Sequence, residues 1–332
     1  MWYTKFGPSG DVVLSSRIRL ARNLKEIPFG TKMTQESEAE VIEKCRTALH
    51  DLKYIDFSVM TPIEKQALSE THLVSPEMVQ NPHKCGLITN DDCTVCVMLN
   101  EEDHIRIQAM APGFDLDSCL DTANIIDDRL DCVLDLAFDP KFGYLTCCPT
   151  NAGTGMRASV MVHLPALTES GNMEKIIRSL SKLGLTVRGI YGEGSRALGN
   201  IYQISNQVTL GVSESETIEK LNQIISDLIE KERKLSRDIY EQNKLRLEDR
   251  IMRSFGTLTN ARLLSSDESM NLLSDVRWGV NLGILQNINL ESLSNVWYQT
   301  MPANITTAFN TQDATERDLK RAELLRDTLR KD

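Results

Sequence analysis

The chain has 332 residues, of which 41% are hydrophobic and 25% charged, as in an ordinary soluble globular protein of one or two domains. Its formal net charge of −10 argues against a general nucleic-acid binder, because neutralising phosphates requires a basic surface. No apolar run approaches the roughly 18 residues that span a bilayer, and the N-terminus does not resemble a signal peptide. We therefore expect a cytoplasmic protein, without direct nucleic-acid or membrane contact, that suits basic partners or substrates.

The eight cysteines all lie between Cys45 and Cys148. In a cytosolic chain of this size we expect reduced thiols rather than a disulfide framework. Cys93 and Cys96 form a CxxC pair, but no second CxxC or histidine pair follows at the spacing of a zinc site. Because both lie in an apolar run, we interpret them as small buried hydrophobic residues and predict no protein-bound metal.

Hydrophobic patterning predicts interleaved strands and helices over the first two thirds of the chain. The predicted strands cover residues 11–20, 93–99, 104–110, 157–165, 185–192 and 200–211, and the predicted helices 35–52, 121–136 and 173–183. Several strands follow one another without a helix between them. This order favours an α+β fold, with a mainly antiparallel sheet flanked by helices, over a doubly wound parallel sheet.

After Gly211 the pattern becomes helical. An apolar stripe with helical spacing runs from Ile218 to Ile229, and helical patterning continues to Asp332. The predicted interruptions lie near Gly256, Gly279, Gly283 and Pro302. We therefore predict two domains, an α/β domain over residues 1–225 and an all-α domain over residues 226–332.

The chain lacks the phosphate-binding loop GxxxxGK[ST] and the signature motifs of protein kinases, so a nucleotide site of the common kinds is not visible. It does place Arg17 and Arg19 two residues apart in a predicted strand, where both side chains share one face. Two neighbouring guanidinium groups suit a polyphosphate, because each can hold phosphate oxygens bidentately. The alternative is a solvent-facing strand edge that carries charge to prevent aggregation.

The acidic run Glu101, Glu102 and Asp103 lies between two predicted strands and precedes His104. Pattern alone favours an acidic hairpin turn followed by a structural histidine. The functional alternative is a carboxylate that acts as a catalytic base.

Three longer strings resemble the phosphagen (guanidino) kinase family in order and spacing. They are NEEDHIRI (100–107), GYLTCCPTNAGTGMRASV (143–160) and VRGIYGEG (187–194). The resemblance covers about residues 11–210 and implies an ATP:guanidino phosphotransferase domain over residues 1–225. Because the segment that resembles the catalytic domain begins almost at Met1, the family's separate N-terminal helical domain is expected to be missing. Arg317 to Ala322 fits the phosphoarginine-recognition motif RDxxRA, so the whole chain resembles the bacterial protein-arginine kinases of the McsB type within that family.

The resemblance also implies a site for ATP, which would bring Mg²⁺ with it. The implied ATP-binding residues are Ser15, Ser16, Arg17, Ile18, Arg19, His72, Arg106, Arg157, Ala158, Ser159, Val160, Met161, Arg188, Gly189, Ile190, Tyr191, Gly192 and Glu193.

On the substrate side, Glu102 matches the family's catalytic carboxylate, with Glu101 beside it, and Cys148 matches the reactive cysteine near the substrate guanidinium. The family usually has a glutamate where this chain has Arg196. The second substrate carboxylate is then Glu193, or the guanidinium is bound less tightly, or Arg196 is a surface side chain.

From this resemblance we expect a protein-arginine kinase that transfers the γ-phosphoryl group of ATP to arginine side chains, acts in the stress response and marks proteins for degradation. It implies a homodimer formed by residues 226–332, which would also bind phosphoarginine through Arg317, Asp318 and Arg321. It further implies a zinc-binding activator protein, a protease–chaperone machine, and a basic heat-shock repressor as substrate. The alternatives are a small-molecule guanidino kinase and a catalytically weak phosphoarginine-binding adaptor, the latter suggested by Arg196.

Overall fold

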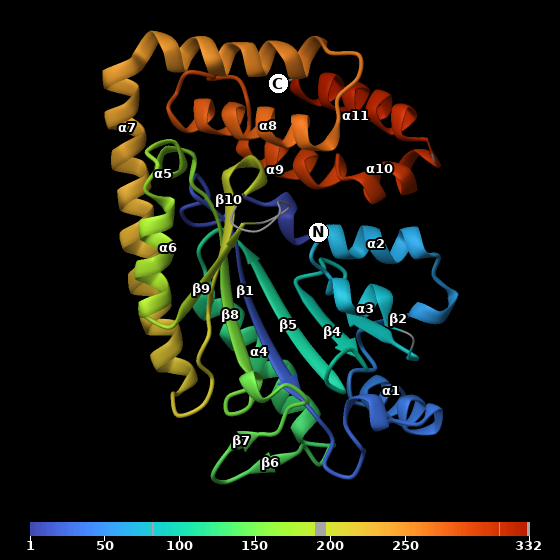
Figure 1. Cartoon of the computed structure of the whole chain (residues 1–332). Helices are drawn as coiled ribbons and strands as arrows, with labels where there is room; N and C mark the ends of the chain where they lie inside the picture. Colours follow the sequence, from blue (N-terminus) through green and yellow to red (C-terminus); the bar gives the residue numbers. More distant parts are fainter. Residues whose placement is uncertain (82, 190–196, 312, 331–332) are drawn as a thin grey trace.

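The computed structural model describes residues 1–81, 83–189, 197–311 and 313–330. Its strands are β1 (Val13–Arg22), β2 (Lys53–Asp56), β3 (Gly86–Thr89), β4 (Val95–Leu99), β5 (Ile105–Pro112), β6 (Phe138–Asp139), β7 (Gly143–Tyr144), β8 (Met156–His163), β9 (Leu185–Gly189) and β10 (Ile201–Asn206). Within the described residues, all but β6 and β7 form an eight-stranded antiparallel sheet in the order β2-β3-β4-β5-β1-β8-β10-β9 (Figure 1). The predicted α+β fold with a mainly antiparallel sheet is confirmed.

The helices lie around this sheet and in a stack beyond one end of its strands (Figure 1). They are α1 (Gln35–Ala48), α2 (Pro62–Glu70), α3 (Pro76–Gln80), α4 (Leu116–Asp131), α5 (Pro165–Glu169), α6 (Met173–Lys182), α7 (Glu214–Asn260), α8 (Ser266–Asn281), α9 (Leu290–Gln299), α10 (Pro302–Phe309) and α11 (Ala314–Leu329). Among the described residues, no helix combines the length and apolar character that crossing a membrane requires.

The strand β1 lies in the middle of the sheet, between β5 and β8. Side chains of a strand point alternately to its two faces. Ile18 and Leu20 are fully buried in the main core, together with Ile126 of α4. Arg17 and Arg19 therefore point to the opposite face, where the candidate site lies.

The helix α7 runs from the sheet into the helical region and breaks at Asn243, where φ is −132° and ψ is 34°. Ile225 and Ile229 pack into the core of the sheet, whereas Leu247 and Ile251 pack into the core of the helical region. The predicted domain boundary at 225/226 therefore falls inside α7, ahead of the point where the side chains change from one core to the other.

The helices end close to the predicted interruptions, with α7 ending at Asn260 and α8 at Asn281. The helices α7 and α8 continue through Gly256 and Gly279, whereas Pro302 begins α10 and Gly283 follows α8. Gly279 lies where α7 and α8 approach each other, since a Cβ atom added there would lie 2.4 Å from Ile251 Cγ2. Glycine at this position therefore permits close helix packing and does not end the helix.

The N-terminal segment joins the helical region to the sheet. Asp11 forms an ion pair of 2.7 Å with Arg233 of α7, and Arg277 of α8 donates to the carbonyl oxygen of Gly10. The ring of Tyr298 in α9 packs 5.3 Å from that of Trp2. The two parts of the chain are thus packed together through buried and half-buried groups.

We predict that Gly279→Ala lowers the free energy of unfolding by about 1–3 kcal/mol, the usual cost of overpacking a core. Chemical denaturation measures this change. The double-mutant cycle with Ile251→Ala is the control, because removing the methyl group that the new Cβ would meet should make Gly279→Ala less costly. An equal cost in both backgrounds would contradict the proposed contact.

Candidate functional site

One face of the sheet carries a cluster of arginines from four strands. They are Arg17 and Arg19 of β1, Arg106 of β5, Arg157 of β8 and Arg188 of β9. Arg19 and Arg157 are direct partners in the β1–β8 register. The alternation of each strand and the antiparallel register together bring residues 171 positions apart in the sequence to one surface.

The arginines of this cluster destabilise one another's charges. Burial, followed by the charges of Arg17, Arg106 and Arg157, holds the pKa of Arg19 well below its usual range. Burial, followed by the charges of Arg188 and Arg106, also lowers the pKa of Arg157. Arg19 Nε is buried and has no hydrogen-bond partner among the described residues. Because a buried donor without an acceptor is costly, the cluster is suited to binding an anion.

Polar neighbours hold Arg17 in place. Its Nη2 donates to Gln203 Oε1 at 2.9 Å, and its Nε donates to Ser159 Oγ at 3.3 Å. Both partners come from the strands on one side of β1. The guanidinium group is thus oriented before any ligand binds, which reduces the entropic cost of binding a ligand there.

Two cavities adjoin over the cluster, since Arg19, Glu77 and Arg188 line both of them. One has a volume of about 600 Å³ and extends past Arg17 and His72 toward the helical region. The other has a volume of about 390 Å³ and is also lined by the acidic turn, Cys148, Thr150 and Asn151. The first has the size of a cavity for a nucleotide-sized ligand.

His72 lies in the first cavity with a backbone φ of +60°, in the left-handed region. Burial, together with the charges of Arg17 and Arg19, lowers its pKa to about 3. The imidazole is therefore neutral at pH 7. Its ring lies edge-on to that of Tyr298, with the centroids 5.9 Å apart, so the helical region also supports this side chain.

The acidic turn holds two carboxylates in different environments. The side chain of Glu101 is 1% exposed, accepts from Ser75 Oγ at 2.5 Å and pairs with Arg106 at 2.9 Å. The side chain of Glu102 is 44% exposed and pairs with Arg106 at 3.0 Å. Burial raises the pKa of Glu102, and the neighbouring carboxylates raise it further, while Arg106 lowers it. Glu101 is thus a buried anchor, and Glu102 is the carboxylate accessible from the cavity.

The two neighbouring cysteines also differ. Cys148 lines the second cavity together with Arg157, and its Sγ lies 3.0 Å from Thr150 Oγ1. Cys147 donates its backbone N–H to Asp103 Oδ1 at 2.7 Å, and burial followed by the charge of Asp103 raises the pKa of its thiol to about 12. Of this pair, Cys148 is the one positioned to meet a ligand.

The structure separates the predicted ATP-binding residues into three groups. Those that line the first cavity, the second cavity or the small space beneath Arg17 are Ser15, Arg17, Arg19, His72, Arg106, Arg157, Ser159, Met161, Arg188 and Gly189. Those whose side chains point to the opposite face are Ser16, Ile18, Ala158 and Val160. Ile190, Tyr191, Gly192 and Glu193 lie outside the described residues, as does Arg196.

Sequence reasoning missed a group of residues that line the first cavity. They are Gln66, Ser69, Glu70, Val74, Ser75, Pro76, Glu77, Gln108, Leu198, Gln203, Ser266, Asp267, Met270, Met301 and Pro302. Several come from the helical region, which the sequence pattern places in a separate domain. No local signal marks them, because they meet the sheet only through tertiary packing.

Of the predicted phosphoarginine-binding residues, Arg317 and Asp318 are half-buried and Arg321 is 1% exposed. Arg321 donates to two backbone carbonyl oxygens and pairs with Asp318 at 2.5 Å. The phosphoarginine site stays a prediction, and it requires Arg321 to exchange these partners for a phosphate.

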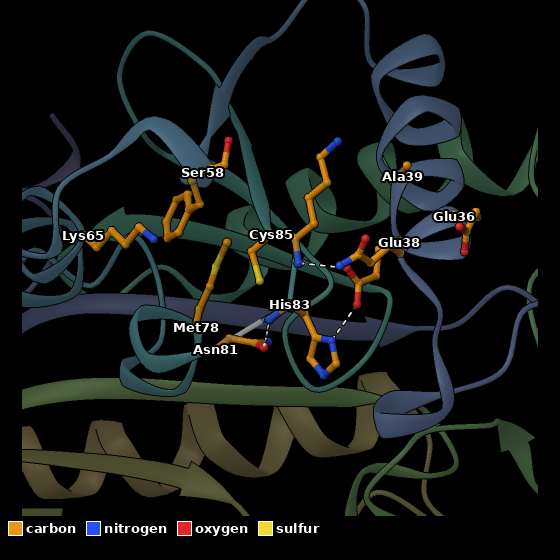
Figure 2. A pocket seen from close by; sticks show the side chains of 12 residues that line it. Glu36, Glu38, Ala39, Ser58, Lys65, Met78, Asn81, His83 and Cys85 are labelled. Carbon is orange, nitrogen blue, oxygen red and sulfur yellow. Dashed lines mark hydrogen bonds and ion pairs between the residues drawn. The ribbon is translucent and has the colours of Figure 1, made fainter.

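A further cavity of about 680 Å³ lies beside α3, on the side away from the arginine cluster. Met78 of α3 lines this cavity, whereas the neighbouring Glu77 lines the two cavities over the arginine cluster. None of the described residues that line it is an arginine. Figure 2 shows the buried Glu38 pairing with His83 at 2.6 Å, and the backbone of Glu38 accepts from Asn100 Nδ2 at 3.0 Å. Asn81, which also lines this cavity, donates from Nδ2 to the carbonyl oxygens of Asn100 and Glu101 at 2.9 and 3.0 Å, so it braces the acidic turn.

Together these groups can bring an anion and a cation into contact. A polyphosphate would bind over the arginine cluster, and a cationic group would bind beside Glu102 in the adjoining cavity. The two ligands would meet near Arg19 and Arg188, which line both cavities. This arrangement is suited to transferring a phosphoryl group between them by positioning and charge stabilisation.

The sequence matches two family descriptions in succession. Residues 32–235 match "ATP:guanido phosphotransferase, C-terminal catalytic domain", and residues 244–332 match "Protein-arginine kinase McsB C-terminal domain". The chain is 49% identical to a protein-arginine kinase of Caldanaerobacter subterraneus subsp. tengcongensis, covering 97% of this chain and 98% of that protein. It is 44% identical to the protein-arginine kinase of Bacillus subtilis, covering 99% and 93%.

Solved structures of two other guanidino kinases share the fold. A lombricine kinase superposes with a TM-score of 0.60 at 29% identity, covering 70% of this chain and 69% of that chain. The substrate-free duplicated taurocyamine kinase of Schistosoma mansoni superposes with a TM-score of 0.60 at 25% identity, covering 76% of this chain. This chain spans only 40% of that duplicated protein.

The two carboxylates of the acidic turn should differ in their effect on stability. We predict that Glu101→Gln lowers the free energy of unfolding by about 1.5–3 kcal/mol, because it removes charged hydrogen bonds from a buried group. The matched variant Glu102→Gln should change it by less than about 1 kcal/mol, as is usual for an exposed pair. Urea denaturation tests both, and equal losses would contradict the distinct environments.

Proposed function

Because this chain belongs to the ATP:guanido phosphotransferase family and, within it, to the protein-arginine kinases, we propose that its two adjoining cavities hold ATP and an arginine side chain of a protein substrate. The enzyme transfers a phosphoryl group from ATP to arginine. The observation that carries the assignment of the cavities is the arginine cluster shared between them, with the accessible carboxylate of Glu102 at its edge.

In this proposal the first cavity binds ATP. Arg17, Arg19 and Arg188 would hold its phosphates, and the neutral His72 would pack against the base or ribose. Arginine suits this task better than lysine, because its planar group holds two oxygens and keeps its charge. The buried Nε of Arg19 would gain the acceptor that it lacks among the described residues.

We propose that Mg²⁺ accompanies ATP. Among the described residues there is no cluster of three metal-ligating side chains, and this fits a metal held mainly by phosphate oxygens and water. Glu77 lines both cavities, and its carboxylate would complete the coordination of the metal. The metal would neutralise charge on the transferred phosphoryl group.

The second cavity would bind the substrate guanidinium beside Glu102. A guanidinium has a pKa above about 12.5, so deprotonating it in advance at pH 7 would cost about 8 kcal/mol. We infer that Glu102 orients the group and accepts its proton as the N–P bond forms and the bond from phosphorus to the ADP oxygen breaks. Glu101 would keep Arg106 in place, and Cys148 would lie near the guanidinium.

A single experiment distinguishes a protein-arginine kinase from the two alternative functions. The purified chain is incubated with Mg-ATP and either free arginine or an arginine-rich protein, and products are analysed by mass spectrometry at neutral pH, which preserves the N–P bond. We expect phosphoarginine on the protein. Phosphorylation of free arginine alone would indicate a small-molecule kinase, and no transfer to either would indicate a binding protein.

We predict that Glu102→Gln lowers phosphoryl transfer by at least about 10²-fold, the effect of losing an acid–base group. ADP binding, measured by calorimetry, should survive, because the nucleotide is held by the arginines of the first cavity. Turnover near that of the unmodified enzyme would contradict a catalytic role for Glu102 and would indicate that the acidic turn is only structural.

The pH dependence should reflect the environment of Glu102. Because its folded pKa is raised above 4.5, the ionised carboxylate is lost as the pH falls through that higher value. We therefore expect the acidic limb of kcat/KM to lie above 4.5, while circular dichroism shows the fold intact. A limb at or below 4.5 would argue against Glu102 as the titrating group.

We also propose that the enzyme forms a homodimer through the second half of α7. Leu245 and Met252 are 80% and 50% exposed, and their spacing of seven residues places them on one face of the helix. Met252→Glu should therefore give monomers in sedimentation experiments. Leu183→Glu is the matched control, since Leu183 is 45% exposed on another surface. A dimer that persists in Met252→Glu would exclude this face.

Its resemblance to the protein-arginine kinases also supports a cytoplasmic role in the stress response, with phosphoarginine marking proteins for a protease–chaperone machine. In that setting we propose a basic heat-shock repressor as substrate and a zinc-binding activator as partner. Co-purification and neutral-pH phosphoproteomics from heat-stressed cells test these partners.

A further inference from the structure

The helical region forms one wall of the first cavity. Two of its segments line the cavity, namely Ser266 and Asp267 at the start of α8, and Met301 and Pro302 at the start of α10. These segments are more than 30 residues apart in the sequence. Their relative position therefore depends on tertiary contacts, and a change there would alter the shape of the cavity.

One side chain of α11 joins both segments. Arg321 Nε donates to the carbonyl oxygen of Thr300 at 2.8 Å, and its Nη1 donates to that of Leu264 at 2.8 Å. Thr300 directly precedes Met301, and Leu264 lies two residues before Ser266. The guanidinium group thus acts as a bridge between the two halves of the wall.

The environment of Arg321 fits a structural bridge. Its side chain is 1% exposed, although burial disfavours its charge and lowers its pKa. Asp318 offsets this cost through a 2.5 Å ion pair, and the charge of Glu70, which itself lines the cavity, acts in the same direction. A charged group buried at this cost keeps its position strongly, because leaving it unpaired would cost more.

The wall is also held from the side of the sheet. The carboxylate of Glu70 at the end of α2 accepts from the backbone N–H groups of Ala303 and Asn304 at 2.9–3.1 Å. It thereby caps α10, which has no side-chain cap of its own among its described neighbours in sequence. Arg321 and Glu70 therefore both fix the start of α10, Arg321 through the carbonyl oxygen of Thr300 and Glu70 through the N–H groups of Ala303 and Asn304.

We propose that Arg321 is a positioning residue for the nucleotide, which holds the two segments of the helical region that wall the ATP cavity. The inference rests on the proposed binding of ATP in that cavity. In this proposal Arg321 contributes to ATP binding whether or not phosphoarginine is bound. A residue that served only to bind phosphoarginine would leave the affinity for nucleotide unchanged when that ligand is absent.

The test compares Arg321→Ala with Arg326→Ala. Arg326 lies on the same helix and also donates to a backbone carbonyl, that of Ala261, which is outside the cavity wall. For Arg321→Ala we expect the Kd for ADP and the KM for ATP to rise about tenfold, a change that corresponds to about 1.4 kcal/mol. The kcat at saturating ATP and the KM for the protein substrate should stay close to those of the unmodified enzyme. Arg326→Ala should leave all four constants unchanged.

Two further variants keep the proposal testable if Arg321→Ala does not fold. Arg321→Lys keeps a donor that can reach one of the two carbonyls, so it should recover part of the affinity for ADP. Asp318→Asn weakens the ion pair that orients Arg321, so it should also raise the Kd for ADP, by a smaller factor than Arg321→Ala. Thermal unfolding of every variant identifies any that fail to fold, and if both Arg321 variants fail, Asp318→Asn decides the question.

The outcomes separate this inference from the proposed function. If Arg17→Ala leaves ADP binding unchanged, the ATP cavity itself is wrong. If Arg17→Ala weakens binding while folded Arg321→Ala does not, only the role of Arg321 is wrong. An equal loss of affinity in Arg321→Ala and Arg326→Ala would indicate general destabilisation and would also overturn the proposal.

Discussion

The strand β1 must satisfy two opposite requirements at once, and the rest of the structure depends on how it does so. Its even-numbered positions, such as Ile18 and Leu20, fill the apolar core, while Arg17 and Arg19 point to the cationic face. A slip of one residue in the register would bury both arginines in the core. Pairing with β5 on one side and β8 on the other prevents this slip and aligns Arg19 with Arg157.

The cationic face carries an electrostatic cost before any ligand binds. Neighbouring guanidinium groups lower the pKa values of Arg19 and Arg157, in addition to the effect of burial. The buried carboxylate of Glu101 offsets part of this repulsion through Arg106. A polyphosphate would relieve the remaining repulsion between the guanidinium groups. The folding energy therefore holds the arginines in the arrangement that binds the anion. Glu102 stays exposed enough to meet a second, cationic ligand.

Much of the fold and part of the site could be predicted from the sequence. The strand and helix patterns, the alternation of Arg17 and Arg19 and the three family strings all depend on residues close together in the chain, and the structure bears out the antiparallel sheet. Because glycine weakens a helix locally, the pattern placed interruptions near Gly256 and Gly279, whereas α7 and α8 continue through these glycines and end shortly after them, at Asn260 and Asn281. The close approach of Ile251 to Gly279 shows why packing between helices overrides that local preference.

The sequence by itself determined the chemistry of this protein: arginines for phosphates, a paired carboxylate for a guanidinium, and membership of a kinase family. Only the tertiary structure decided which of Glu101 and Glu102 is accessible, and that Arg321 is buried behind the wall formed by Asp267 and Met301. Residue types and short spacings fix which interactions are possible. Exposure and cavity shape arise from contacts between segments that are distant in sequence, and no local pattern encodes these contacts.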